Sequence, residues 1–128
     1  MRCTVPETLV DALAIRDTNA HDPSTTHDTT PDALFADVHE WRGWTLKVAN
    51  TLDQAVTLTL YGNFAISTTG ADDYADTLSV AADAVGYITF HIARTAWTPW
   101  IYPSLQCSVA PTSGAVTVEI VKLDKMEK

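Results

Sequence analysis

Hydrophobic and polar residues alternate most regularly in the part of the chain that follows Trp41. Alternate residues of a β-strand face opposite sides of a sheet, so this pattern predicts strands with one buried face. The expected strands and their inward residues are 44–49 (Trp44, Leu46, Val48), 55–61 (Val56, Leu58, Leu60), 77–80, 86–92 (Ile88, Phe90, Ile92), 100–109 (Ile101, Leu105, Cys107, Val109) and 115–123 (Val116, Val118, Ile120). Their spacing predicts an all-β fold of about 6–8 strands, an antiparallel β-sandwich that is jelly-roll-like or a small barrel.

The composition changes near residue 40. Residues 1–40 contain no glycine, no lysine and one aromatic residue, Phe35, with eight acidic residues against two arginines. The stretch 18–31 is polar and has no periodic apolar face, which predicts an extended segment on the surface. Its flanks, 9–15 and 33–38, fit either a short helix or a strand. We therefore expect an extended N-terminal arm over residues 1–40 and a β-sandwich domain over residues 41–128.

The net charge of −8 bears on partners. Nucleic-acid binding requires a basic patch, and four lysines and four arginines are scattered along the chain, so neither nucleic acid nor an anionic membrane is an expected partner. Aspartates outnumber glutamates twelve to four, which is typical of proteins from salt-loving organisms and is also found in ordinary acidic proteins. The N-terminus lacks the apolar region of a secretory signal, so we expect synthesis and folding in the cytoplasm.

Candidate catalytic and metal-binding residues are few. His21, His27 and His39 each precede an acidic residue, but the first two lie in the polar stretch, where a solvated linker is expected rather than a metal site. Asp72, Asp73 and Asp76 are expected in one loop, as an acidic cluster that does not match a known calcium loop. Two cysteines, Cys3 and Cys107, are expected as free thiols, with Cys107 in the core. No nucleophile motif or phosphate loop is found, so we expect a non-enzyme with no catalytic residues, metal or cofactor.

The tryptophans carry the clearest functional signal. They form two pairs, Trp41 with Trp44 and Trp97 with Trp100. Trp44 is in phase with the predicted core, whereas Trp100 and Tyr102 fall on the face opposite Ile101 and are expected to project outward. Three interpretations remain open: a second core layer under the N-terminal arm, a protein–protein contact, or a platform on which a sugar stacks. The interface candidates are Trp97, Trp100, Tyr102 and Trp41.

Three stretches of the chain also suggest a family. The run WTLKVANTLDQAVTLTLYGN, then VAADAVGYITF and PWIYPSLQCSVAPTSGAVTVEIVKL, resembles small β-sandwich structural proteins of tailed viruses of bacteria and archaea. The matching elements are 50–53, Tyr61-Gly62 and 110–118, and the similarity covers residues 41–123. The resemblance implies a virion component, either a capsid decoration or turret subunit or a tail-associated subunit. The acidic composition would then point to a virus of a haloarchaeon.

Two functions from different classes follow. The first is a non-enzymatic virion structural protein that is assembled in the host cytoplasm as a symmetric homo-oligomer and contacts other virion proteins. The alternative is a carbohydrate- or receptor-binding β-sandwich module with a glycan as partner.

Overall fold

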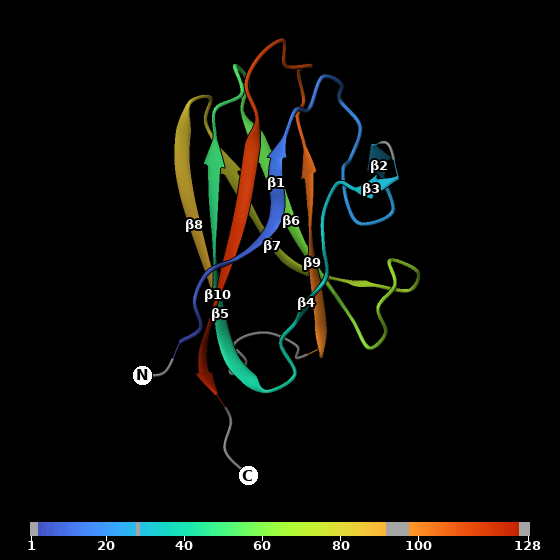
Figure 1. Cartoon of the computed structure of the whole chain (residues 1–128), viewed down its shortest axis with the longest axis vertical. Helices are drawn as coiled ribbons and strands as arrows, with labels where there is room; N and C mark the ends of the chain where they lie inside the picture. Colours follow the sequence, from blue (N-terminus) through green and yellow to red (C-terminus); the bar gives the residue numbers. More distant parts are fainter. Residues whose placement is uncertain (1–2, 28, 92–97, 126–128) are drawn as a thin grey trace.

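The computed structural model describes residues 3–27, 29–91 and 98–125, and its two four-stranded antiparallel sheets lie face to face as a β-sandwich (Figure 1). Sheet A has the order β1-β10-β5-β8, and sheet B has the order β4-β9-β6-β7. The all-β antiparallel sandwich expected from the sequence is confirmed. The strands are β1 (Glu7–Leu13), β2 (Thr26–His27), β3 (Thr30–Pro31), β4 (Ala36–Asp37), β5 (Trp41–Asn50), β6 (Val56–Asn63), β7 (Asp72–Val80), β8 (Ala84–His91), β9 (Trp100–Gln106) and β10 (Val116–Lys125).

The core fills the space between the two sheets. Alternation decides which side chains enter it, because every second residue of a strand faces the opposing sheet. Trp44, Leu46, Leu58 and Leu60 are fully buried, and Trp44 stacks on Phe90 with ring centroids 6.5 Å apart. The inward residues expected from β5, β6 and β10 are therefore confirmed. Burying an aliphatic or aromatic side chain of this size contributes about 1.5–3 kcal/mol each, so these strands dominate stability.

The segment expected as an extended N-terminal arm supplies a strand to each sheet. β1 pairs with β10 at the edge of sheet A, and β4 pairs with β9 at the edge of sheet B (Figure 1). Leu9 and Val10 of β1 and Ala36 of β4 are buried in the common core. The boundary expected at residue 40 therefore falls inside the sandwich. The apolar flanks of the polar stretch pack on the core, and the polar stretch itself connects them.

One buried amide joins the turns at one end of the sandwich. The Asn50 side chain accepts a hydrogen bond from Leu52 N at 3.0 Å and donates to the carbonyl oxygens of Gln54 and Ala81, both at 3.1 Å. Asparagine suits this position because its side chain can bond the backbone of its own turn. Asp53 contributes differently, because its carboxylate accepts a hydrogen bond from Thr112 N at 2.9 Å. The β5–β6 turn is thereby attached to the loop that precedes β10.

Two strand expectations need correction. Val109 was expected inward but is 54% exposed, because β9 ends at Gln106 and its pleat no longer constrains the residues that follow. Asp72, Asp73 and Asp76, the acidic cluster expected in a loop, are residues of strand β7.

The two thiols are free as expected, with Cys3 exposed and Cys107 in the core. In the described part of the chain no helix is long and apolar enough to cross a membrane.

Candidate interaction surface

The outer face of sheet B carries an aromatic layer that is partly covered by the N-terminal segment. Tyr102 of β9 lies opposite Tyr61 of β6, and their rings stack with centroids 5.4 Å apart. Phe35, just before β4, meets Tyr102 edge-on at 5.3 Å. Tyr102 is only 4% exposed, so the expectation that it projects into solvent is wrong. Its strand phase is outward as expected, but a second layer covers it.

The four interface candidates therefore have different environments. Tyr102 fits the first interpretation, a second core layer under the N-terminal segment, and its burial together with Asp22 and Tyr61 raises its pKa to about 12. Trp100 and Trp41 are half-buried, at the start of β9 and of β5. Trp97 lies outside the described residues. Trp100 thus keeps part of its ring available for a partner, whereas Tyr102 does not.

A buried histidine holds the covering segment against β9. The backbone of His21 exchanges two hydrogen bonds with Leu105, at 2.8 and 2.9 Å. Its ring lies between two carboxylates, with Nδ1 2.8 Å from Asp32 Oδ2 and Nε2 2.8 Å from Asp17 Oδ1. The side chain of His21 is 6% exposed. The solvated linker expected at His21 is therefore wrong, because the bridge to β9 and the two carboxylates give this residue a fixed environment.

The charge state of His21 follows from this geometry. A neutral imidazole donates from one nitrogen only, whereas the imidazolium donates from both, so the cation suits two carboxylate neighbours. Burial alone lowers the pKa of His21, but the hydrogen bonds to Asp32 and Asp17 outweigh burial and hold the pKa above its ordinary value. The hydrogen bond between His21 and Asp17 also lowers the pKa of Asp17. We call Asp17, His21 and Asp32 the His21 clamp.

Among the described residues, His39 is the other histidine with carboxylate neighbours, and it lies on the surface. His39 is exposed and its ring bonds to Asp37. The side chains of His27 and His91, and of the acidic cluster in β7, are outside the described part of the structure. Within the residues that the structure describes, no group of three or more His, Cys, Asp and Glu side chains could hold a metal ion.

Sequence analysis missed an exposed apolar loop that follows β6. Phe64 is 75% exposed and Ile66 is 60% exposed. Asn63, which lies opposite Trp100 in the sheet, donates hydrogen bonds to the carbonyl oxygens of Ser67 at 2.8 Å and Thr69 at 2.9 Å. The loop is therefore braced in one shape while it presents two large apolar side chains. The sequence feature that indicated this loop is the run 54–71, which contains no charged residue and includes both Phe64 and Ile66.

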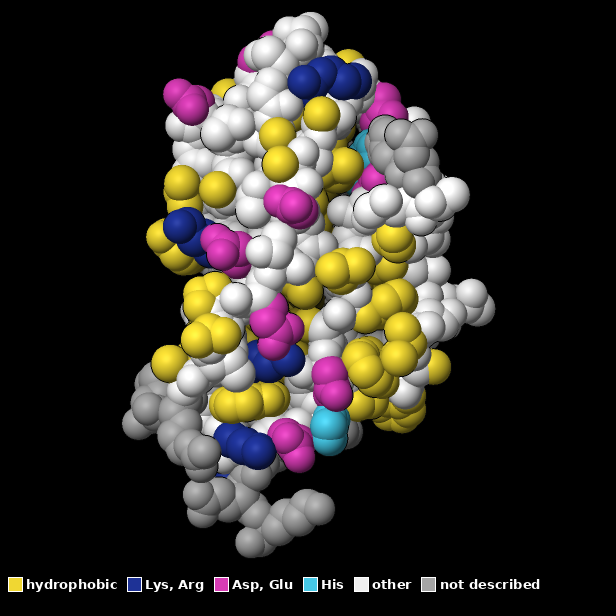
Figure 2. All heavy atoms as spheres, in the orientation of Figure 1, with side chains coloured by type: hydrophobic (Ala, Val, Ile, Leu, Met, Phe, Trp, Pro, Cys, Tyr) yellow, Lys and Arg dark blue, Asp and Glu magenta, His cyan; other side chains and the backbone are white. Residues whose placement is uncertain are grey.

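Apolar side chains gather on this side of the molecule. Figure 2 shows hydrophobic atoms grouped over the region where β4, β9 and the loop after β6 lie in Figure 1. Leu34, two residues before β4, is 49% exposed. Phe64 and Ile66, in the loop after Asn63, and the half-buried Trp100 opposite Asn63 form what we call the apolar patch. Exposed apolar groups of this size are typical of contact surfaces.

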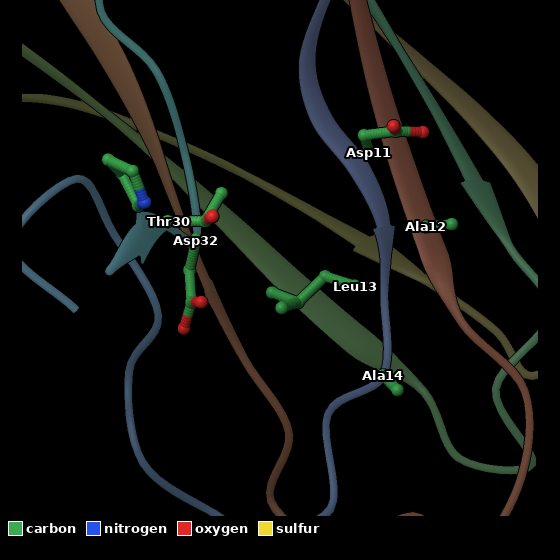
Figure 3. A pocket seen from close by; sticks show the side chains of 7 residues that line it. Asp11, Ala12, Leu13, Ala14, Thr30 and Asp32 are labelled. Carbon is green, nitrogen blue, oxygen red and sulfur yellow. The ribbon is translucent and has the colours of Figure 1, made fainter. Parts of the chain in front are cut away.

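A separate shallow pocket lies between β1 and β3. It has a volume of about 250 Å³ and is lined by Asp11, Ala12, Leu13, Ala14, Thr30, Pro31 and Asp32. The side chain of Leu13 extends from β1 toward the segment that carries Thr30 and Asp32 (Figure 3). No aromatic side chain lines the pocket, so it lacks the flat ring on which a sugar stacks.

Comparisons with known proteins identify the fold. No protein-family model and no curated protein matches the chain. Among solved structures, the chain is similar to PBSX exported protein XepA, with a TM-score of 0.67 and 14% identity over 97% of this chain. It spans 39% of the length of XepA. It is also similar to the SPBc2 prophage-derived protein YomS, with a TM-score of 0.53 and 14% identity over 97% of this chain and 96% of YomS.

The TM-scores show that the three proteins share a β-sandwich fold. At 14% sequence identity, the similarity extends to the fold alone. Both neighbours are phage-derived proteins. Neither supports a haloarchaeal origin.

Proposed function

We propose that this chain is a non-enzymatic structural protein of a phage or phage-like particle, and that it works as a homo-oligomer in contact with other particle proteins. The observation that supports this proposal most strongly is the similarity of 97% of the chain to two phage-derived proteins. The matched fold makes up nearly all of YomS but about two fifths of XepA, so it occurs both alone and within a longer chain.

The surface of the described residues is consistent with assembly. Phe64 and Ile66 project from a braced loop, and Trp100 is only half covered. Large aromatic and aliphatic side chains that stay exposed in a monomer gain free energy when a partner covers them, at roughly 25 cal/mol per Å². The net charge of −8 of the whole chain favours solubility of the unassembled protein.

Molar mass by light scattering on a sizing column, at low and at molar salt, tests the proposal. A discrete oligomer is expected, and molar salt should strengthen it, because salt screens the repulsion between chains of net charge −8. The variant Phe64→Ser with Ile66→Ser should weaken assembly without changing the free energy of unfolding. A monomer in both salts, at concentrations up to the millimolar range, would overturn the homo-oligomer.

A carbohydrate-binding function is the second candidate, and Trp100 is the observation that favours it. Trp100 is half-buried at the start of β9, so part of this aromatic residue is available to a sugar, whereas Tyr102, two residues later, is buried. A glycan that binds there should quench tryptophan fluorescence, and Trp100→Ala should abolish the response while Trp41→Ala leaves it. A flat response over a glycan panel would remove this candidate.

A further inference from the structure

The two sheets have four edges, and three of them are protected against pairing with another strand. β1 has two irregularities in its register with β10, and Leu34 N already bonds to Leu9 O at 2.9 Å. β4 is two residues long. β7 begins with acidic residues and meets a register irregularity in its pairing with β6. Short length, irregularity, covering and charge are the devices that keep sheet edges from associating.

The fourth edge, β8, has none of these devices among its described residues. It runs for eight residues from Ala84 to His91 and pairs with β5 without a register shift. It contains no proline and no lysine, arginine, aspartate or glutamate. It lies at the outer margin of sheet A, and Figure 2 shows hydrophobic side chains along that margin. Val85 is 53% exposed and Tyr87 is 62% exposed.

We infer that β8 is a self-association edge, at which two copies of this chain pair their β8 strands antiparallel about a two-fold axis at Tyr87. Directly opposed residues in an antiparallel pair face the same side of the sheet. When two β8 strands pair, each outward-facing residue must therefore lie opposite an outward-facing residue of the second copy. An axis at Tyr87 places Tyr87 opposite its own copy. It places Val85 opposite Thr89 of the second chain. Both pairs are of the aromatic or β-branched kind that stabilises sheets, and the two four-stranded sheets become one of eight strands.

Charge favours a second copy as the occupant in spite of the net charge of −8. The one charged neighbour of Tyr87 across the β5–β8 ladder is Lys47. In the paired arrangement the two Lys47 residues lie three strand spacings apart, about 14 Å, which exceeds the Debye length of about 8 Å at physiological salt. The nearest acidic residue along the strand is the exposed Asp83, which directly precedes β8, and an axis at Tyr87 places the two copies of Asp83 at opposite ends of the contact. The contact therefore brings no like charges close together.

This inference rests on the proposed homo-oligomer and specifies one of its contacts. Cysteine crosslinking tests it in a Cys3→Ser background, because Cys3 is the exposed native thiol. Tyr87→Cys should form a disulfide-linked dimer under mild oxidation. Thr89→Cys, two residues away on the same strand, should not form one, since it faces Val85 of the second chain. The combination of Val85→Cys with Thr89→Cys should restore crosslinking.

A charge variant supplies an independent measurement. Tyr87→Lys places two ammonium groups opposite each other and should weaken association at least tenfold. Phe64→Lys, at another exposed aromatic residue, should leave the crosslinking of Tyr87→Cys unchanged. If wild-type protein is oligomeric but Tyr87→Cys does not crosslink and Tyr87→Lys assembles normally, the β8 contact is wrong and the proposed function stands. If the wild type is monomeric, both the β8 contact and the proposed homo-oligomer are wrong.

Discussion

The central strands and the N-terminal segment reach the same core in different ways. β5 and β10 each run for ten residues and bury alternate side chains almost without interruption. The chain from 14 to 38 contributes isolated apolar residues, such as Ile15, Ala33 and Val38, separated by polar backbone. A continuous ladder is cooperative, whereas isolated anchors depend on local hydrogen bonds such as those of His21. Damage to the central strands should therefore unfold the whole domain, and damage to the segment should open that segment alone.

The largest expected effect comes from Trp44. Its ring is fully buried and packs on Phe90, so Trp44→Ala removes a large apolar contact and leaves a cavity. We expect a loss of about 3–5 kcal/mol in the free energy of unfolding, measured by urea denaturation. The matched control is Trp41→Ala, three residues earlier and only half-buried, which should cost clearly less. Equal losses would contradict the assignment of Trp44 to the core.

A glycine pair tests how closely the turns of the central strands pack. Gly114 has φ +85°, and a Cβ at this position would lie 2.0 Å from the carbonyl oxygen of Thr51. Gly114→Ala therefore adds a backbone clash to the strain of a positive φ, and we expect a loss of about 3 kcal/mol. Gly70 has φ +74° with no atom within 4 Å, so Gly70→Ala should cost about 1 kcal/mol, from strain alone. Urea denaturation of both variants should reproduce this order.

The regular ladders could be predicted from the sequence because alternation is a property of each strand by itself. Trp44, Leu58 and Ile120 are buried where their phase places them. Tyr102 shows the limit of the same reasoning. Its phase correctly placed it on the outer face of β9, but phase does not say what covers a face, and Phe35, 67 positions earlier in the chain, covers this one.

The His21 clamp could not be predicted for a related reason. Asp17 and Asp32 lie four and eleven residues from His21, on either side of the polar stretch 18–31, which has no periodicity. Only the backbone bridge between His21 and Leu105 of β9 brings the three side chains together, and that bridge joins residues 84 positions apart. Polar clusters of this kind depend on tertiary contacts, which leave no local pattern.

Removal of the clamp should affect the N-terminal segment more than the central strands. His21→Ala leaves Asp32, which is 6% exposed, without its imidazole neighbour, and we expect a cost of about 2 kcal/mol, the usual range for hydrogen bonds to charged groups. Hydrogen exchange should rise over residues 14–34, while β5 and β10 keep their protection. His39→Ala is the matched control, since His39 is exposed and bonds only to neighbours on the surface. Equal exchange in the two variants would show that the clamp does not hold the segment.

The smallest expected effect is the pH dependence of the clamp, because deprotonation removes the charge of His21 but leaves its packing. The pKa of His21 is raised from 6.5, so its contribution to stability is fully present below pH 6.5 and is lost as the pH rises through the folded-state pKa. The pKa of Asp17 is lowered from 3.8, so its contribution is present above pH 3.8 and is lost as the pH falls through its folded-state pKa. The clamp should be strongest between these limits. The free-energy cost of His21→Ala should therefore be larger at pH 5.5 than at pH 8.5, whereas the cost of Trp44→Ala should be the same at both. A cost of His21→Ala that does not change with pH would mean that the imidazole holds the segment by packing and by its neutral hydrogen bond.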